Sequence, residues 1–116
     1  MHEKNISLIG DKMIVKEGII KDNTLKLETV EVDLGNTTLL VLSGYNAFAM
    51  CGALNVDIYN SPKMYERKVI CMRAVGVKTL EQLYEAKIEE SSNYAKEKGI
   101  IPGMYIKDAF KKLSLE

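Results

Sequence analysis

The residues best suited to chemistry lie around Cys51, which follows the apolar run AFAM at 47–50 and directly precedes Gly52. We expect a short helix over 52–60, and a thiol at the start of a helix can become a thiolate because the helix dipole stabilises negative charge. Cys51 is therefore either a nucleophile presented on a turn or a small apolar residue that ends a buried strand. Asn55 follows in the same segment and joins the candidate site.

A second candidate is Arg73, the charged residue within the apolar run at 69–77. It shares a predicted strand face with Cys71, and a buried guanidinium needs a carboxylate or an anionic ligand. Arg73 therefore either forms a structural ion pair, with Asp57 as the candidate partner, or binds a small anion. The candidate ligand-binding residues are Cys51, Gly52, Asn55 and Arg73.

Missing residues exclude several classes of enzyme. The one histidine is His2, whereas a Ser–His–Asp or Cys–His arrangement needs a base within hydrogen-bond reach of the nucleophile. His2 meets that need only if it folds back or comes from a neighbouring subunit. The sequence has no Cys-x-x-Cys, no His-Glu-x-x-His and no glycine-rich phosphate loop, so we expect neither a metal site nor a cofactor.

The composition describes one globular domain of 116 residues, with 47% hydrophobic and 28% charged residues. Sixteen basic residues balance sixteen acidic ones, which argues against nucleic acid as a partner because such binding needs a basic excess. No run approaches the ~18 apolar residues of a membrane span. The N-terminus has no apolar signal core, and both cysteines suit reduced thiols. We expect a cytoplasmic protein without a membrane partner.

The N-terminal part of the chain predicts a β-meander. Runs rich in Ile, Val and Leu are separated by turn residues such as Lys21-Asp22-Asn23 and Gly35-Asn36. The continuous apolar runs at 38–43, 47–51 and 69–77 indicate strands that are buried on both faces.

The predicted strand at 24–34 changes its apolar face partway along. Two groups of residues share opposite faces: Leu25 and Leu27 on one, and Val30, Val32 and Leu34 on the other. Such a change needs a β-bulge, or a strand whose two ends pack on different neighbours. A long strand that joins another subunit would have this pattern.

The C-terminal third predicts helices. Thr79 and Gln82 have the spacing of a capping box, and apolar residues then recur at helical intervals until Gly99, a predicted C-terminal stop. A short final helix follows Pro102-Gly103. Strands first and helices last predict an α+β fold: a two-layer sandwich in which two to three helices pack on one face of an N-terminal β-meander or mixed sheet. We expect one domain over 1–116, with a β-rich oligomerisation region at 1–45 and an α+β core at 46–116.

Three motifs give a resemblance to a known family: MCGALNV at 50–56, RAVGVKTLEQL at 73–83 and KGIIPGMYIKDAFKKL at 98–113. In this order they resemble the YunC-like family of small bacterial and archaeal proteins, a domain of unknown function, over roughly 40–113. One departure is Ala47, where the family pattern has a glycine before the aromatic residue. The resemblance implies a tetramerisation surface in the N-terminal β region and brings no catalytic residues.

These observations predict no specific activity. They favour a homo-oligomer, expected to be a tetramer formed through the N-terminal strands, that serves as an assembly or small-ligand-binding module. A small anionic ligand would then bind near Cys51 and Arg73. The alternative is an enzyme that uses Cys51 as a thiolate nucleophile at or near a subunit interface.

Overall fold

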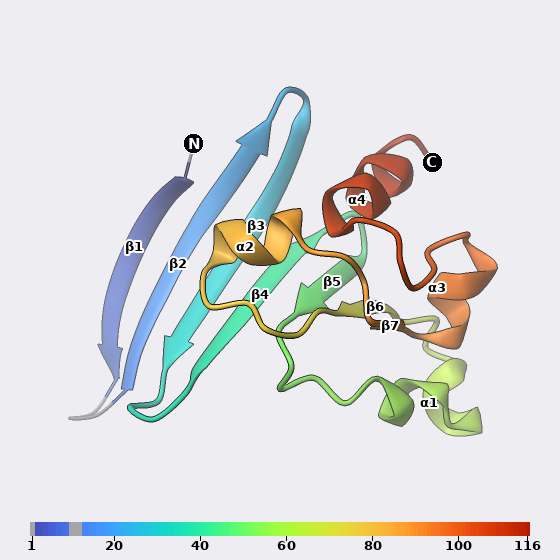
Figure 1. Ribbon diagram of the computed structural model, residues 1–116, viewed down its shortest axis with the longest axis horizontal. Helices are drawn as coiled ribbons and strands as arrows, with labels where there is room; N and C mark the ends of the chain where they lie inside the picture. Colours follow the sequence, from blue (N-terminus) through green and yellow to red (C-terminus); the bar gives the residue numbers. More distant parts are fainter. Residues whose placement is uncertain (1, 10–12) are drawn as a thin grey trace.

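One mixed sheet of seven strands forms the framework of the computed structural model, which describes the backbone of residues 2–9 and 13–116 and the side chains of 14–116. The strands follow one another across the sheet in chain order (Figure 1), and all neighbours are antiparallel except β5 and β6. The strands are β1 (His2–Ile9), β2 (Met13–Asp22), β3 (Leu25–Asp33), β4 (Thr38–Gly44), β5 (Ala47–Met50), β6 (Ile70–Arg73) and β7 (Glu90–Ser91).

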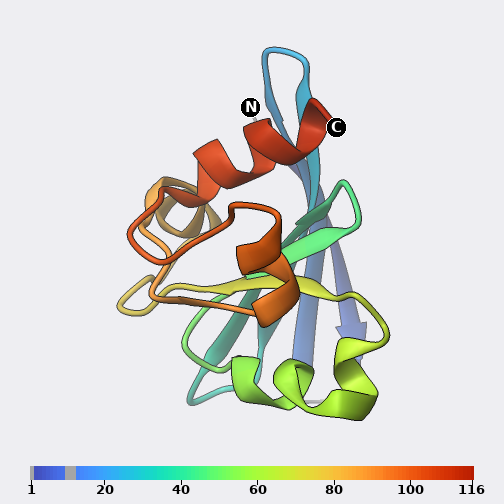
Figure 2. The ribbon, with the colours of Figure 1, turned by 90° about the vertical axis from the view of Figure 1, so that its right-hand side faces the viewer.

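Helices complete the α+β fold that the sequence predicts. They are the 3-10 helix η1 (Val56–Asn60), α1 (Pro62–Tyr65), α2 (Leu80–Glu85), α3 (Asn93–Glu97) and α4 (Ile106–Ser114). Helices α2 and α4 lie on one side of the long N-terminal strands, whereas η1 and α1 belong to the connection between the parallel strands β5 and β6 (Figure 2).

The main core lies between the sheet and helices α2, α3 and α4. Alternate residues of each strand point to one face, and on the helix-covered face β3 buries Leu27 while β4 buries Leu40 and Leu42. The helices contribute Leu83 and Phe110, both fully buried in the same cluster. A second, smaller cluster on the other face of β5 and β6 is closed by the segment before and within η1.

Strand β3 changes its apolar face without a bulge. Its register with β2 runs unbroken from Ile14↔Asp33 to Asp22↔Leu25, and its register with β4 is also continuous. The first half of β3 buries Leu25 and Leu27 beneath the helices, whereas Val30 in the second half lies on the opposite face. Of the two explanations that the sequence left open, the β-bulge is therefore excluded for these pairings.

Six described apolar side chains lie on that opposite face of β2, β3 and β4: Ile19, which is paired with Glu28, and five that are neighbours of one another. Because directly paired residues share a face, the pairs Val30↔Val41, Val32↔Leu39 and Val15↔Val32 place them side by side. We call this set the valine patch: Val15, Val30, Val32, Leu39 and Val41. All five are half-buried and belong to neither core cluster, and α2 and α4 cover the other face.

Two predicted elements end earlier than expected. The strand at 69–77 stops at Arg73, so that 74–77 forms a loop. The single helix expected between Thr79 and Gly99 is wrong, because β7 divides it into α2 and α3. The reason is that Ser91 pairs with β6 and its hydroxyl donates to the carbonyl of Ile100, contacts that a continuous helix would lose.

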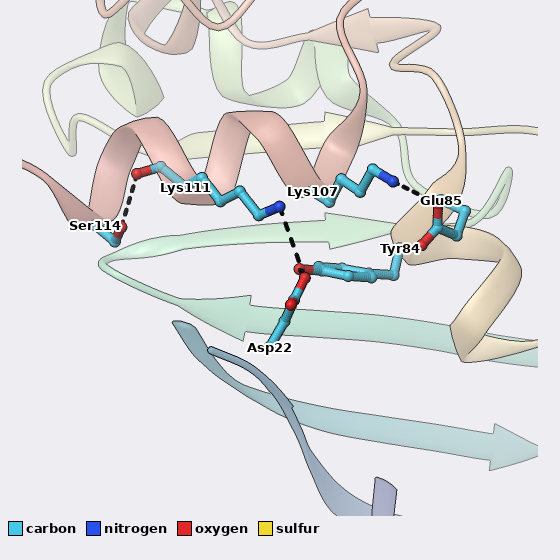
Figure 3. A network of polar contacts seen from close by, with 6 residues as sticks. All are labelled: Asp22, Tyr84, Glu85, Lys107, Lys111 and Ser114. Carbon is cyan, nitrogen blue, oxygen red and sulfur yellow. Dashed lines mark hydrogen bonds and ion pairs between the residues drawn. The ribbon is translucent and has the colours of Figure 1, made fainter. Parts of the chain in front are cut away.

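A polar network ties α2 and α4 to the end of β2 (Figure 3). The Tyr84 hydroxyl donates to the Asp22 carboxylate at 2.8 Å, and Lys111 Nζ lies 3.7 Å from the same carboxylate. Lys107 of α4 pairs with Glu85 of α2 at 2.7 Å. The Tyr84 hydrogen bond, assisted by Lys111, lowers the pKa of Asp22, while burial and the Asp22 contact raise the pKa of Tyr84. The network fixes both helices over the N-terminal strands.

Candidate functional site

Cys51 lies just beyond the end of β5 and packs into the main core. Its backbone N–H donates to the carbonyl of Leu40 at 3.3 Å, and 7% of the residue is exposed. Its thiol makes a weak hydrogen bond to the carbonyl of Thr38, with Sγ 3.8 Å from the oxygen. These contacts extend the β4–β5 pairing by one residue.

The helix expected over 52–60 begins later than predicted. The chain turns at Gly52, and the first helical residue is Val56 of η1. Asn55 caps η1, because its side-chain oxygen accepts the N–H of Asp57 at 3.2 Å. Cys51 therefore does not stand at a helix N-terminus, and the dipole argument for a thiolate no longer applies to it.

Arg73, at the carboxyl end of β6, reaches across to the turn after Cys51. Its Nε and Nη2 donate to the carbonyl of Gly52 at 3.2 and 3.1 Å, and its Nη1 donates to Glu89 Oε2 at 2.9 Å. The ion pair with Asp57 that the sequence suggested is wrong, because Arg73 pairs with Glu89. Glu89 takes that place because it directly precedes β7, whose pairing with β6 puts Glu90 beside Arg73.

The arrangement around Arg73 is a clamp between three segments. It brings together the carboxyl ends of β5 and β6 and the approach to β7, and it satisfies the guanidinium without a ligand. Of the predicted site residues, Gly52 and Arg73 are in contact here. The Cys51 thiol is directed to the carbonyl of Thr38 instead, and the Asn55 side chain caps its own helix. An anion at this point would have to displace Glu89.

Cys71, in the middle of β6, is fully buried. Burial raises the pKa of its thiol to about 11, and the hydrogen bond with Ser92 opposes that rise. A thiol with such a pKa is protonated at neutral pH and is a poor nucleophile.

The described residues include neither a cluster of metal-ligating side chains nor a helix that could span a membrane. None of their His, Cys, Asp and Glu side chains form a group of three or more that could hold a metal ion. None of the helices in the described segments is both long and apolar enough to cross a membrane.

A cavity of about 770 Å³ opens at the amino ends of β5 and β6, opposite the Arg73 clamp. We call it the β5–β6 cavity. Its lining includes three basic residues, Arg67, Lys68 and Lys98, and aromatic residues from β5 and α3. The sequence analysis missed this cavity because its lining residues come from separate segments. The available signal was the pair of adjacent basic residues, Arg67 and Lys68, directly before the apolar run at 69–77.

Comparisons with known proteins agree with one another. The family model described as "Domain of unknown function (DUF1805)" matches residues 50–113. Protein YunC of Bacillus subtilis (strain 168), described as uncharacterized, is 37% identical over 84 residues, which cover 72% of this chain and 82% of YunC. The crystal structure of TA1206, a protein of unknown function from Thermoplasma acidophilum, superposes with a TM-score of 0.72 at 33% identity, covering 92% of this chain and 98% of TA1206. The chain therefore belongs to the YunC-like family defined by the DUF1805 domain.

Proposed function

We propose that this chain is a self-assembling module whose N-terminal strands join copies of the same chain into a tetramer. The observation that supports this proposal is the valine patch, an apolar surface on the sheet face opposite α2 and α4. Burial of such side chains against a second copy is favourable in proportion to the apolar area removed from water, at roughly 25 cal/mol per Å².

Charge complementarity favours a second copy as the occupant. The same face of β2 and β3 also carries exposed residues of both signs: Glu17 is paired with Val30 at the border of the valine patch, and Lys21, Lys26 and Glu28 lie beyond it. In a two-fold interface the same surface of both copies takes part, and an axis that passes close to these residues sets acidic residues of one copy opposite basic residues of the other. A surface of one sign would repel its own copy.

The sheet edge supports a second contact between copies. Strand β1, with eight residues, pairs with β2 on one side and has no partner on its other side among the described strands. Such edges readily pair with another chain. A closed tetramer of two-fold symmetry needs two different interfaces, and the valine patch and the β1 edge supply one each.

We place this assembly in the cytoplasm and without nucleic acid as a partner. Both cysteines are free and buried, which suits a reducing compartment. The equal numbers of acidic and basic residues support the exclusion of nucleic acid.

Sedimentation velocity of the variant Val30→Asp tests the proposal. The intact chain should sediment with four times the mass of the 13.0 kDa chain, and Val30→Asp should give dimers or monomers because it places a charge inside an apolar contact. Val75→Asp is the matched control, since Val75 lies in a loop and is 49% exposed. Circular dichroism checks that each variant is folded. If Val30→Asp does not fold, the milder variant Val30→Thr replaces it, and this variant should only weaken assembly. A monomeric intact chain, or folded Val30 variants with unchanged assembly, would refute it.

A further inference from the structure

The β5–β6 cavity has the size and the lining of a small-molecule site. Its volume of about 770 Å³ falls within the roughly 300–1,000 Å³ of ligand sites. Its walls come from the β4–β5 turn, the segment before β6, helix α3 and the end of the chain after α4. It lies at the opposite end of β5 and β6 from the Arg73 clamp, so its lining shares no residue with the candidate site predicted from the sequence.

Basic side chains dominate the charge of this cavity. Arg67, Lys68 and Lys98 face one acidic residue, Glu116. Arg67 and Lys68 are exposed and form no ion pair with any residue that the structure describes. A cavity with two uncompensated cations attracts an anion, and an arginine beside a lysine matches the several oxygens of a phosphate group.

Two aromatic rings border the cavity from opposite faces of the sheet, Tyr94 on the side of the main core and Phe48 on the side of the smaller cluster, and each packs against a second ring. Tyr94 makes an edge-to-face contact with Tyr65, with ring centres 6.4 Å apart, and Phe48 makes one with Tyr59 at 5.8 Å. Lys98 Nζ lies 5.9 Å from the centre of the Tyr94 ring. Because a fixed ring stands next to a cation, the cavity suits a ligand that joins a flat ring to a negative group.

Glu116 occupies part of the cationic wall. Its carboxylate accepts a hydrogen bond from Lys98 Nζ at 3.0 Å, and this contact raises the pKa of Lys98. An oxyanion of a ligand would make the same contact with Lys98. Glu116 therefore competes with an anionic ligand for one of its cations.

From this charge and geometry we infer that the β5–β6 cavity binds an aryl phosphate, that is, a phosphate monoester carried on a flat ring. The phosphate contacts Arg67, Lys68 and Lys98, and the ring packs against Phe48 and Tyr94. This inference does not depend on how copies of the chain assemble.

Nuclear magnetic resonance titration with phenyl phosphate tests this inference on the full chain. We expect saturable shifts of backbone amides at Lys68, Tyr94 and Lys98. Inorganic phosphate and phenol should bind more weakly, because each of them makes only part of these contacts. Arg67→Ala should lower the affinity for phenyl phosphate about tenfold or more, as expected for the loss of a charge-assisted hydrogen bond. Glu116→Gln should strengthen it by about two- to fivefold, because an exposed competing ion pair is lost.

The control is Lys63→Ala, which removes an exposed lysine of α1 outside the cavity lining. It should leave the affinity unchanged. The inference is overturned by absence of saturable shifts, by Arg67→Ala and Lys63→Ala behaving alike, or by Glu116→Gln weakening the binding. Inorganic phosphate binding as tightly as phenyl phosphate would overturn the role of the rings. Since the sedimentation experiment uses other residues, either proposal can fail without the other.

Discussion

The hydroxyl of Ser92 joins two separate parts of the fold, and its removal should be unusually costly for a serine. It donates to the carbonyl of Val69 at 2.7 Å, and it accepts the N–H of Cys71 at 3.3 Å and the N–H of Ala95 at 3.3 Å. The last contact is the N-cap of α3, while the first two hold the start of β6. Ser92 is fully buried, so water cannot replace these partners after Ser92→Ala.

The size of the effect follows from these contacts. Loss of an N-cap costs about 1 kcal/mol. The bonds to Val69 and Cys71 contribute about 1 kcal/mol each, and more if the buried N–H of Cys71 stays unsatisfied. We therefore expect Ser92→Ala to lower the free energy of unfolding by about 3 kcal/mol. Thr79→Ala is the control, and it should cost about 1 kcal/mol. Thr79 is exposed, and its hydroxyl caps α2 by accepting the N–H of Gln82.

Urea denaturation followed by circular dichroism measures both variants. All samples need the same protein concentration, because the stability of an assembly depends on concentration. A difference of about 2 kcal/mol between the variants corresponds to a roughly 30-fold change in the unfolding equilibrium. Equal losses for Ser92→Ala and Thr79→Ala would refute the reasoning, since they would show that the contacts to β6 contribute nothing.

Three further tests concern titrating groups. The Tyr84 hydrogen bond lowers the pKa of Asp22 below its ordinary value of 3.8. The ionised Asp22 therefore stabilises the fold fully above pH 3.8, and this contribution is lost as the pH falls through the lowered pKa. In Tyr84→Phe the melting temperature should therefore fall less steeply between about pH 5 and pH 2 than in the unchanged protein. An identical pH profile would contradict the role of the Tyr84 hydrogen bond in lowering the pKa of Asp22. Cys71, with a pKa of about 11, should resist iodoacetamide at pH 8 in the native state. A pH profile of Cys51 alkylation tests the thiolate hypothesis, which fails if the apparent pKa lies near the unperturbed ~8.5 or if no native reaction occurs.

Local signals in the sequence predicted local structure correctly. Thr79 caps α2 as its spacing with Gln82 predicts, although the Gln82 side chain accepts from Lys78 and not from Thr79. Gly99 ends α3 with a positive φ of 82°, and the N–H groups of Gly99 and Ile100 close the last turn. Each of these features depends on residues that are neighbours along the chain, so no knowledge of the tertiary structure is needed.

The errors arose where a distant partner decides the conformation. Helical periodicity continues through 86–92, but the backbone of β7 pairs there with β6, and this pairing overrides the pattern. The same pairing brings Glu89 to Arg73, whereas the sequence had suggested Asp57 as the ion-pair partner of Arg73. The phase change of β3 was visible in the sequence, whereas the choice between a bulge and a second packing surface needed the registers of two neighbouring strands.

The parallel pair β5 and β6 separates two electrostatic environments, and this separation decides where a ligand is expected. At the carboxyl ends, Arg73 is held by Glu89 and by the carbonyl of Gly52, so an incoming anion would replace contacts that already exist. At the amino ends, Arg67 and Lys68 lack an ionic partner among the described side chains. An anion gains more from a free cation than from one that must first lose its partner. The sequence drew attention to the carboxyl ends through an unusual arginine, whereas the electrostatic argument favours the amino ends.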